Sequence, residues 1–111
     1  MMLLDLTVIV KHYNKKASII GAINMISKEV TVTNSVGLHA RPATFFIQKA
    51  NEFKSTILVE KEERRVNAKS LLGILSLGIT KGTTINLIAD GPDEEEAVTA
   101  LVELITSNFA D

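Results

Sequence analysis

One histidine in this sequence stands where a helix could help it carry an anion. His39 lies just before the first predicted helix, and Arg41 follows it by two residues. The first backbone N–H groups of a helix have no partner inside the helix and bind anions well. They would hold a phosphoryl group on the imidazole, and a guanidinium would add a forked cation that suits phosphate oxygens. The positive end of the helix dipole favours the neutral imidazole, whose lone pair can attack phosphorus. The residues alone leave two readings open: a phosphohistidine site, or a polar helix cap followed by a solvent-exposed arginine.

Ser70 is the second candidate for chemistry. It follows Lys69 and precedes a short apolar helix. Serine is among the preferred residues at a helix N-cap, so an ordinary structural cap explains it. A phosphate on Ser70 would also be well placed at the start of that helix. Both readings stay open at this point.

The leucines after Ser70 cannot all face inward from one short helix. They either form an exposed patch for a partner or fold under and complete the core. They are Leu71, Leu72, Leu75 and Leu77.

The remaining charged groups are interpreted as structural. We expect residues 93–96 to cap a helix rather than bind a metal, and residues 61–65 to form a solvated turn. His12 has no second histidine or carboxylate arranged around it, and we assign it no function.

Alternation of apolar residues predicts the elements that position these groups. Periods of 2 and 3.6 residues succeed each other after Met25 in the order β-α-β-β-α-β-α. Three helices with polar outer faces can cover only one side of a four-stranded sheet, which predicts a two-layer α+β sandwich. Pro42 is expected to set the start of the first helix. Asp93 and Glu96 are expected to form a capping box on the last one. The expected strands are 29–33, 56–60, 65–67 and 84–89, and the expected helices are 42–50, 70–75 and 93–105.

Bulk properties narrow the class of protein. A chain of 111 residues with net charge −1 fits one domain and gives no support for direct nucleic-acid binding. The absence of cysteine excludes disulfides and thiolate catalysis. The apolar run at residues 1–10 is about half the length that a membrane-spanning helix needs, and its lysines follow rather than precede it. We therefore expect a cytoplasmic protein without membrane insertion.

Two segments of the chain resemble a known family. Residues 37–43, Gly-Leu-His-Ala-Arg-Pro-Ala, resemble the active-site motif of HPr, the histidine phosphocarrier of the bacterial sugar phosphotransferase system. Residues 66–78, which contain Ser70, resemble its regulatory-serine segment. The resemblance covers residues 25–111 and implies an open-faced β-sandwich with a four-stranded antiparallel sheet.

The resemblance also implies a function. His39 would accept phosphate from phospho-Enzyme I on Nδ1 and donate it to an EIIA domain, with assistance from Arg41. The protein would be a carrier component rather than a stand-alone enzyme, a monomer, and would need no cofactor or metal. Ser70 would be phosphorylated by the ATP-dependent HPr kinase/phosphorylase of low-GC Gram-positive bacteria, and phospho-Ser70 would make the protein a corepressor for catabolite control protein A. Docking would fall to Leu71, Leu72 and Leu75.

The chain departs from the family at residues 1–24. We interpret them as an upstream in-frame start or added sequence, non-native or disordered, with an extra strand or partner-binding arm as the alternative. Three other interpretations of the protein's function remain open. One is a regulatory protein similar to Crh, which keeps the serine and lacks the histidine, so that His39 argues against it. The others are a phosphocarrier of the nitrogen-related branch and a small ligand-binding module with an apolar pocket.

Overall fold

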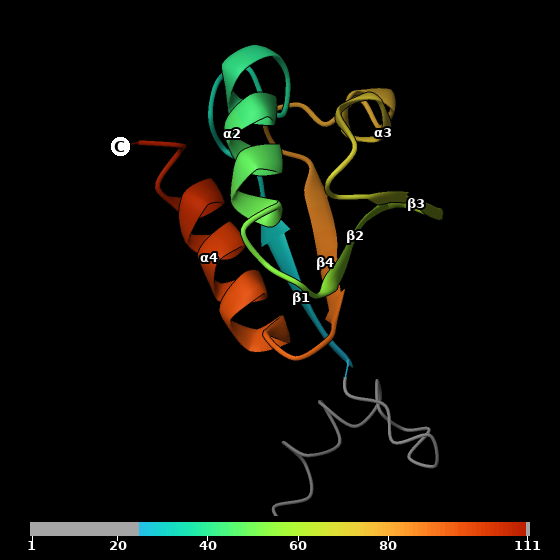
Figure 1. Ribbon diagram of the computed structural model, residues 1–111. Helices are drawn as coiled ribbons and strands as arrows, with labels where there is room; N and C mark the ends of the chain where they lie inside the picture. Colours follow the sequence, from blue (N-terminus) through green and yellow to red (C-terminus); the bar gives the residue numbers. More distant parts are fainter. Residues whose placement is uncertain (1–24, 111) are drawn as a thin grey trace, which may run out of the picture.

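The computed structural model describes residues 25–110, and the expectations for residues 1–24 lie outside them. The described elements follow the predicted order β-α-β-β-α-β-α (Figure 1). No helix among these residues is both long and apolar enough to span a membrane. The elements are β1 (Met25–Thr31), α2 (Ala40–Ala50), β2 (Thr56–Lys61), β3 (Arg64–Asn67), α3 (Leu71–Ser76), β4 (Thr84–Asp90) and α4 (Glu94–Thr106).

The strands form one antiparallel sheet in the order β1-β4-β2-β3. All three helices pack on one face of it and leave the other face uncovered (Figure 1). The predicted two-layer α+β architecture is confirmed. The sheet order places α2 and α3 close to each other, so that the segments carrying His39 and Ser70 belong to one helical layer.

The core lies between the sheet and the helices, where the sequence periodicities placed it. Alternate residues of the strands and one stripe of each long helix are buried together, and each large apolar side chain so buried contributes about 1.5–3 kcal/mol. The buried residues include Ile57 and Val59 of β2, Ile85, Leu87 and Ala89 of β4, Ala43, Phe46 and Ala50 of α2, and Ala97, Val98, Leu101 and Ile105 of α4.

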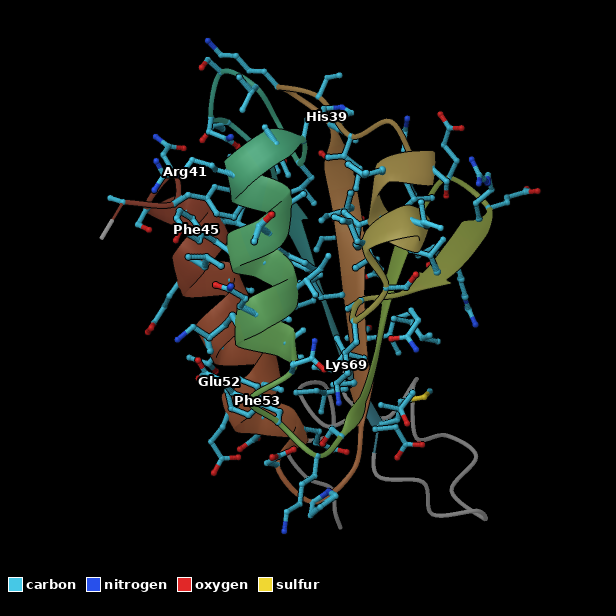
Figure 2. The ribbon with its side chains drawn as sticks, turned by 45° about the horizontal axis from the view of Figure 1, so that its top comes forward. His39, Arg41, Phe45, Glu52, Phe53 and Lys69 are labelled. Atoms are coloured by element: carbon cyan, nitrogen blue, oxygen red, sulfur yellow. The ribbon has the colours of Figure 1, made fainter. Side chains whose placement is uncertain are left out.

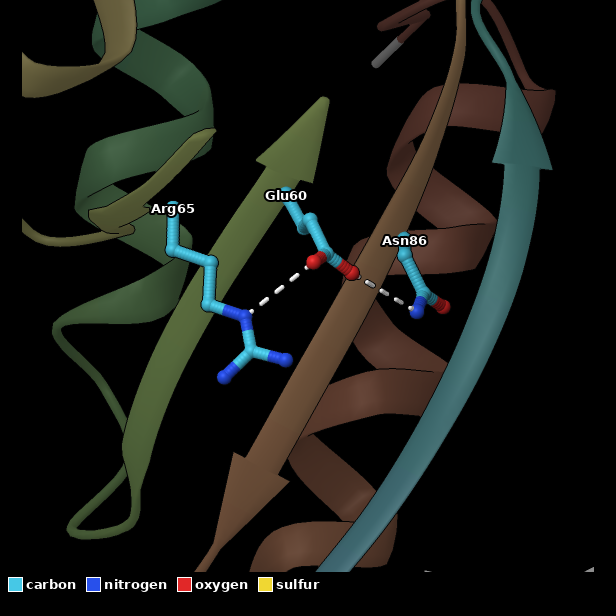
Figure 3. Close-up of polar contacts among 3 residues, drawn as sticks. All are labelled: Glu60, Arg65 and Asn86. Carbon is cyan, nitrogen blue, oxygen red and sulfur yellow. Dashed lines mark hydrogen bonds and ion pairs between the residues drawn. The ribbon is translucent and has the colours of Figure 1, made fainter. Parts of the chain in front are cut away.

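Polar side chains gather on the uncovered face of the sheet. Glu60 accepts a hydrogen bond from Arg65 Nε at 3.2 Å and one from Asn86 Nδ2 at 3.4 Å (Figure 3). Ile88 lies on the same face, two residues beyond Asn86 on β4, yet it is only 8% exposed. A central strand has neighbours on both sides, and this limits solvent access to Ile88.

The turn predicted at residues 61–65 is present, with Glu62 and Glu63 exposed at its tip, but the prediction that its cations are only solvated was wrong. Lys61 Nζ donates to the carbonyl oxygens of Leu77 and Gly78, at 2.9 and 3.3 Å. Arg64 donates to the carbonyl oxygen of Ser76 at 3.0 Å. The last carbonyl groups of a helix have no partners inside the helix and attract cations. The β2–β3 hairpin therefore caps the C-terminal end of α3.

The capping box predicted for α4 was also wrong. The side chain of Asp93 makes no cap hydrogen bond to its own helix. Its carboxylate accepts hydrogen bonds from Ser55 Oγ at 2.6 Å and from the backbone N–H groups of Lys54 and Ser55 at 2.9 Å. The Ser55 hydroxyl and the Lys54 N–H lower the pKa of Asp93, because they stabilise its charged form. Glu94, not Glu96, turns back to accept from the N–H of Gly91 at 3.0 Å.

Candidate functional site

His39 occupies the N-cap position of α2, where its backbone is extended (φ −132°, ψ 162°). Its side chain makes no cap hydrogen bond and is half-buried. The imidazole therefore does not stabilise the helix as a polar cap would. This removes the structural explanation that the sequence left open for His39. His39 directly precedes the first helical turn, whose N–H groups have no partner inside the helix, and this position at the helix start agrees with the sequence prediction.

The loop before His39 is fixed against a distant part of the chain. The backbone N–H of Leu38 donates to the carbonyl oxygen of Ile79 at 3.0 Å, and the Leu38 side chain is fully buried. Gly37 has φ +66°, and a Cβ there would overlap the backbone of Ile79 and Thr80. Only glycine allows this close approach. The sequence motif contains Gly37, but the sequence did not explain why a glycine stands there.

Helix α2 begins at Ala40, two residues before the predicted start at Pro42. Ala40 has φ +54°, in the left-handed region that costs a non-glycine residue about 1–2 kcal/mol. Pro42 falls within the first turn, where its missing N–H costs nothing. Backbone strain therefore lies directly beside His39. Strained residues of this kind often cluster at active sites and ligand-binding sites.

Arg41 is exposed, and the structure does not place its guanidinium on the histidine. The Arg41 Cζ lies 5.4 Å from the centroid of the Phe45 ring. Figure 2 shows His39 at the N-terminal end of α2 and the Arg41–Phe45 pair on the flank of the helix. The contact is a cation–π interaction between residues four positions apart on one helix face. Phe45 was not among the residues singled out in the sequence.

Ser70 is the N-cap of α3, as the structural reading of the sequence expected. Its Oγ accepts a hydrogen bond from the backbone N–H of Gly73 at 3.0 Å. Lys69 ties the same segment to the turn after α2, because its Nζ donates to the carbonyl oxygen of Phe53 at 2.7 Å. Together with the hairpin contacts at its other end, these bonds hold α3 at both termini.

The leucines of α3 divide between the surface and the core. Leu72 is 79% exposed and Leu71 is 46% exposed, whereas Leu75 is half-buried against the core and Leu77 is buried. Val36, in the turn before His39, is 50% exposed. The sequence alone did not identify it as a surface residue. An apolar residue inside a turn was the signal that could have identified it. Exposed apolar groups thus lie on both segments that carry the candidate residues.

The sequence matches a known family over most of its length. The family model described as "PTS HPr component phosphorylation site" matches residues 26–107. The HPr-like protein Crh of Halalkalibacterium halodurans is 51% identical over 81 residues, which cover 73% of this chain and 96% of that protein. The phosphocarrier protein HPr of Neisseria meningitidis serogroup A is 44% identical over 87 residues, 78% of this chain and 98% of that protein.

Solved structures agree in fold. A crystal structure of HPr from Thermoanaerobacter tengcongensis is similar with a TM-score of 0.75 and 50% identity, and the match covers 77% of this chain and 96% of that one. The crystal structure of Bacillus subtilis Crh has a TM-score of 0.62 at 42% identity and covers 76% of this chain and 97% of that one. That Crh structure is described as a domain-swapped, intertwined dimer.

Proposed function

The chain belongs to the HPr family of phosphocarrier proteins of the bacterial phosphotransferase system, and from this premise we propose that His39 accepts a phosphoryl group from phospho-Enzyme I and passes it to sugar-specific EIIA domains. The observation that carries the proposal is the half-exposed His39 side chain, which makes no cap hydrogen bond at the N-terminus of α2. The imidazole has a lone pair that can attack phosphorus, and helix α2, whose first N–H groups suit phosphoryl oxygens, begins at the next residue.

The transfer needs no cofactor from this chain. The Nδ1 lone pair of neutral His39 attacks phosphorus, a P–N bond forms, and the bond between phosphorus and the donor breaks. The phosphoryl oxygens then accept hydrogen bonds from the first N–H groups of α2 and from Arg41. In the second transfer, the nucleophile of the acceptor attacks the same phosphorus and the P–N bond to His39 breaks.

Labelling with phosphoenolpyruvate and Enzyme I tests the proposal. Mass spectrometry should find one added phosphate that is labile in acid on the parent chain and none on the His39→Ala variant. Adding an EIIA domain should remove that phosphate. A parent chain that stays unmodified, both at full length and when begun at Met25, would refute the carrier role.

We also propose Ser70 as a regulatory phosphorylation site for the ATP-dependent HPr kinase/phosphorylase, with catabolite control protein A as the partner of the modified protein. The 51% identity to Crh supports this second role, and the alternative of a purely regulatory, Crh-like protein depends on it. Kinase and ATP should add an acid-stable phosphate to the parent and none to Ser70→Ala. If this label forms while His39 is never labelled, the Crh-like alternative is the better account.

Leu71 and Leu72 are exposed on α3, and Leu75 is half-buried beside them. We propose that Leu71, Leu72 and Leu75 contact Enzyme I and EIIA domains in the cytoplasm, and that the carrier acts as a monomer. Leu72→Ser should slow labelling of His39 by Enzyme I without changing the free energy of unfolding, because Leu72 is 79% exposed. Light scattering after size exclusion should give the mass of one chain, and a dimer mass would overturn the monomer.

A further inference from the structure

We propose that Phe45 is a positioning residue that holds Arg41 on the flank of α2 while His39 is unphosphorylated and releases it to the phosphoryl group. The proposal rests on the proposed carrier function of His39. It gives the pair a resting and an engaged arrangement, in which the same guanidinium contacts either an aromatic ring or phosphate.

The resting contact is set by the helix. Arg41 and Phe45 are four residues apart, so their side chains lie one above the other on the same face of α2. The 5.4 Å between the guanidinium carbon and the ring centroid is within the range of cation–π attraction. The ion pairs among residues 25–110 join Lys49 to Glu52 and Arg65 to Glu60, so no carboxylate of the described chain competes with the ring for Arg41.

The ring is anchored, whereas the arginine can move. Phe45 is half-buried against the core and lines a hollow between α2 and α4 together with Leu104 and Phe109. Phe109 is buried itself, so that the hollow has a packed apolar wall. Arg41 is exposed and is joined to the helix by a long flexible side chain. A change in the charge of His39 will therefore move the guanidinium and leave the ring in place.

The relative strengths of the two contacts decide which arrangement dominates. A cation–π contact at an exposed site is weak, whereas forked hydrogen bonds from a guanidinium to a phosphoryl group are charge-assisted and strong. Arg41 should thus rest on Phe45 in the free protein and leave it in phospho-His39. The resting contact opposes phosphorylation, because it stabilises only the unphosphorylated state.

NMR spectroscopy tests the resting contact without requiring transfer. Ring currents should displace the Arg41 δ protons upfield in the parent chain and in Phe45→Tyr, which keeps the aromatic face. The displacement should be absent in Phe45→Leu, which keeps the apolar contacts, and urea unfolding of each variant checks that its fold is intact. An unchanged Arg41 signal in Phe45→Leu would overturn the proposal.

The equilibrium between phosphoenolpyruvate and pyruvate tests the coupling. With Enzyme I present and the ratio of the two metabolites fixed, Phe45→Leu should raise the ratio of phosphorylated to free protein by about two- to five-fold, the size of an exposed cation–π contact. Phe45→Tyr should match the parent. In an Arg41→Met background, Phe45→Leu should not change the ratio of phosphorylated to free protein further. These four proteins form a double-mutant cycle, which isolates the interaction of the two side chains.

The outcomes separate this proposal from the carrier function. If His39 is labelled and Phe45→Leu leaves the equilibrium unchanged, or alters it equally without Arg41, the positioning role is wrong and the carrier function stands. If His39 is never labelled, both are wrong, whatever NMR finds at Arg41.

Discussion

Gly37 brings the backbone before His39 against the Ile79–Thr80 segment, and this contact determines where the histidine lies. The adjacent hydrogen bond from Leu38 to Ile79 and the burial of the Leu38 side chain fix the same loop. The position of His39 thus depends on a residue without a side chain. This explains in physical terms why a glycine stands two positions before the histidine.

Gly37→Ala should lower the free energy of unfolding by about 2 kcal/mol or more, because the new Cβ meets both an unfavourable φ and the backbone of Ile79. Urea unfolding measures the loss. Gly82→Ala is the matched control, since Gly82 also has positive φ (+92°) but would place its Cβ in open space. Equal losses at the two positions would show that the close approach contributes nothing.

Helix α3 is held at its start by its own N-cap and at its end by the β2–β3 hairpin. Ser70 caps its start, while Lys61 and Arg64 bind the carbonyl groups at its end. A helix of six residues is too short to be stable alone, so these contacts and the burial of Ile74 determine that it forms.

Ser70→Ala should reduce the free energy of unfolding by about 1 kcal/mol, the usual loss when a serine N-cap is removed. Ser70→Asp keeps an acceptor for the N–H of Gly73 and should retain most of the stability. Thermal or urea unfolding of the two variants compares them directly. If both lose the same amount, the hydrogen bond at the cap is not what stabilises the helix.

The start of α4 depends on pH through Asp93. Its pKa lies below the ordinary value of 3.8, so its hydrogen bonds stabilise the fold fully above that value. This contribution is lost as the pH falls through the lower pKa of the folded state, because the protonated carboxyl is a weaker acceptor.

Asp93→Asn should therefore be less stable than the parent at neutral pH, and the difference should shrink as the pH falls below 3.8. Urea midpoints at several pH values would follow this change. Asp90→Asn removes an exposed carboxylate from the nearby end of β4 and serves as the control for charge alone. A difference between parent and Asp93→Asn that stays constant with pH would contradict the assignment.

At the scale of the whole molecule, the turn after α4 packs back onto the core through Phe109. Asn108 and Phe109 both have positive φ, which costs free energy for residues other than glycine. Burial of the Phe109 ring offsets that strain, and the hydrogen bond from Thr33 to Asn108 (2.7 Å) ties the turn to the loop after β1. The end of the chain is thereby joined to the segment that leads to His39.

Phe109→Ala should lower the free energy of unfolding by about 3 kcal/mol, because it removes a buried ring and leaves the backbone strain without compensation. Phe109→Leu should lose less than half of that. Calorimetry or urea unfolding would measure both. A loss below about 1 kcal/mol for Phe109→Ala would show that the turn is not part of the folded core.

The sequence alone determined the order of the elements, the buried faces and the positions of His39 and Ser70 at helix starts. These features depend on periodicity and on helix-terminal residues, which act over a few positions of the chain. Whether Leu71, Leu72, Leu75 and Leu77 face inward or outward was left open, because the periodicity of one short helix does not decide it.

Only the tertiary structure decided which polar groups meet across the fold. Asp93 binds Ser55, 38 residues away, instead of capping α4, and Lys61 binds Leu77 instead of solvent. A carboxylate or an ammonium group can satisfy several partners, and the sequence does not rank them. The choice is made when the burial of apolar faces brings distant backbone groups within hydrogen-bond distance, since those groups cannot be buried without a partner.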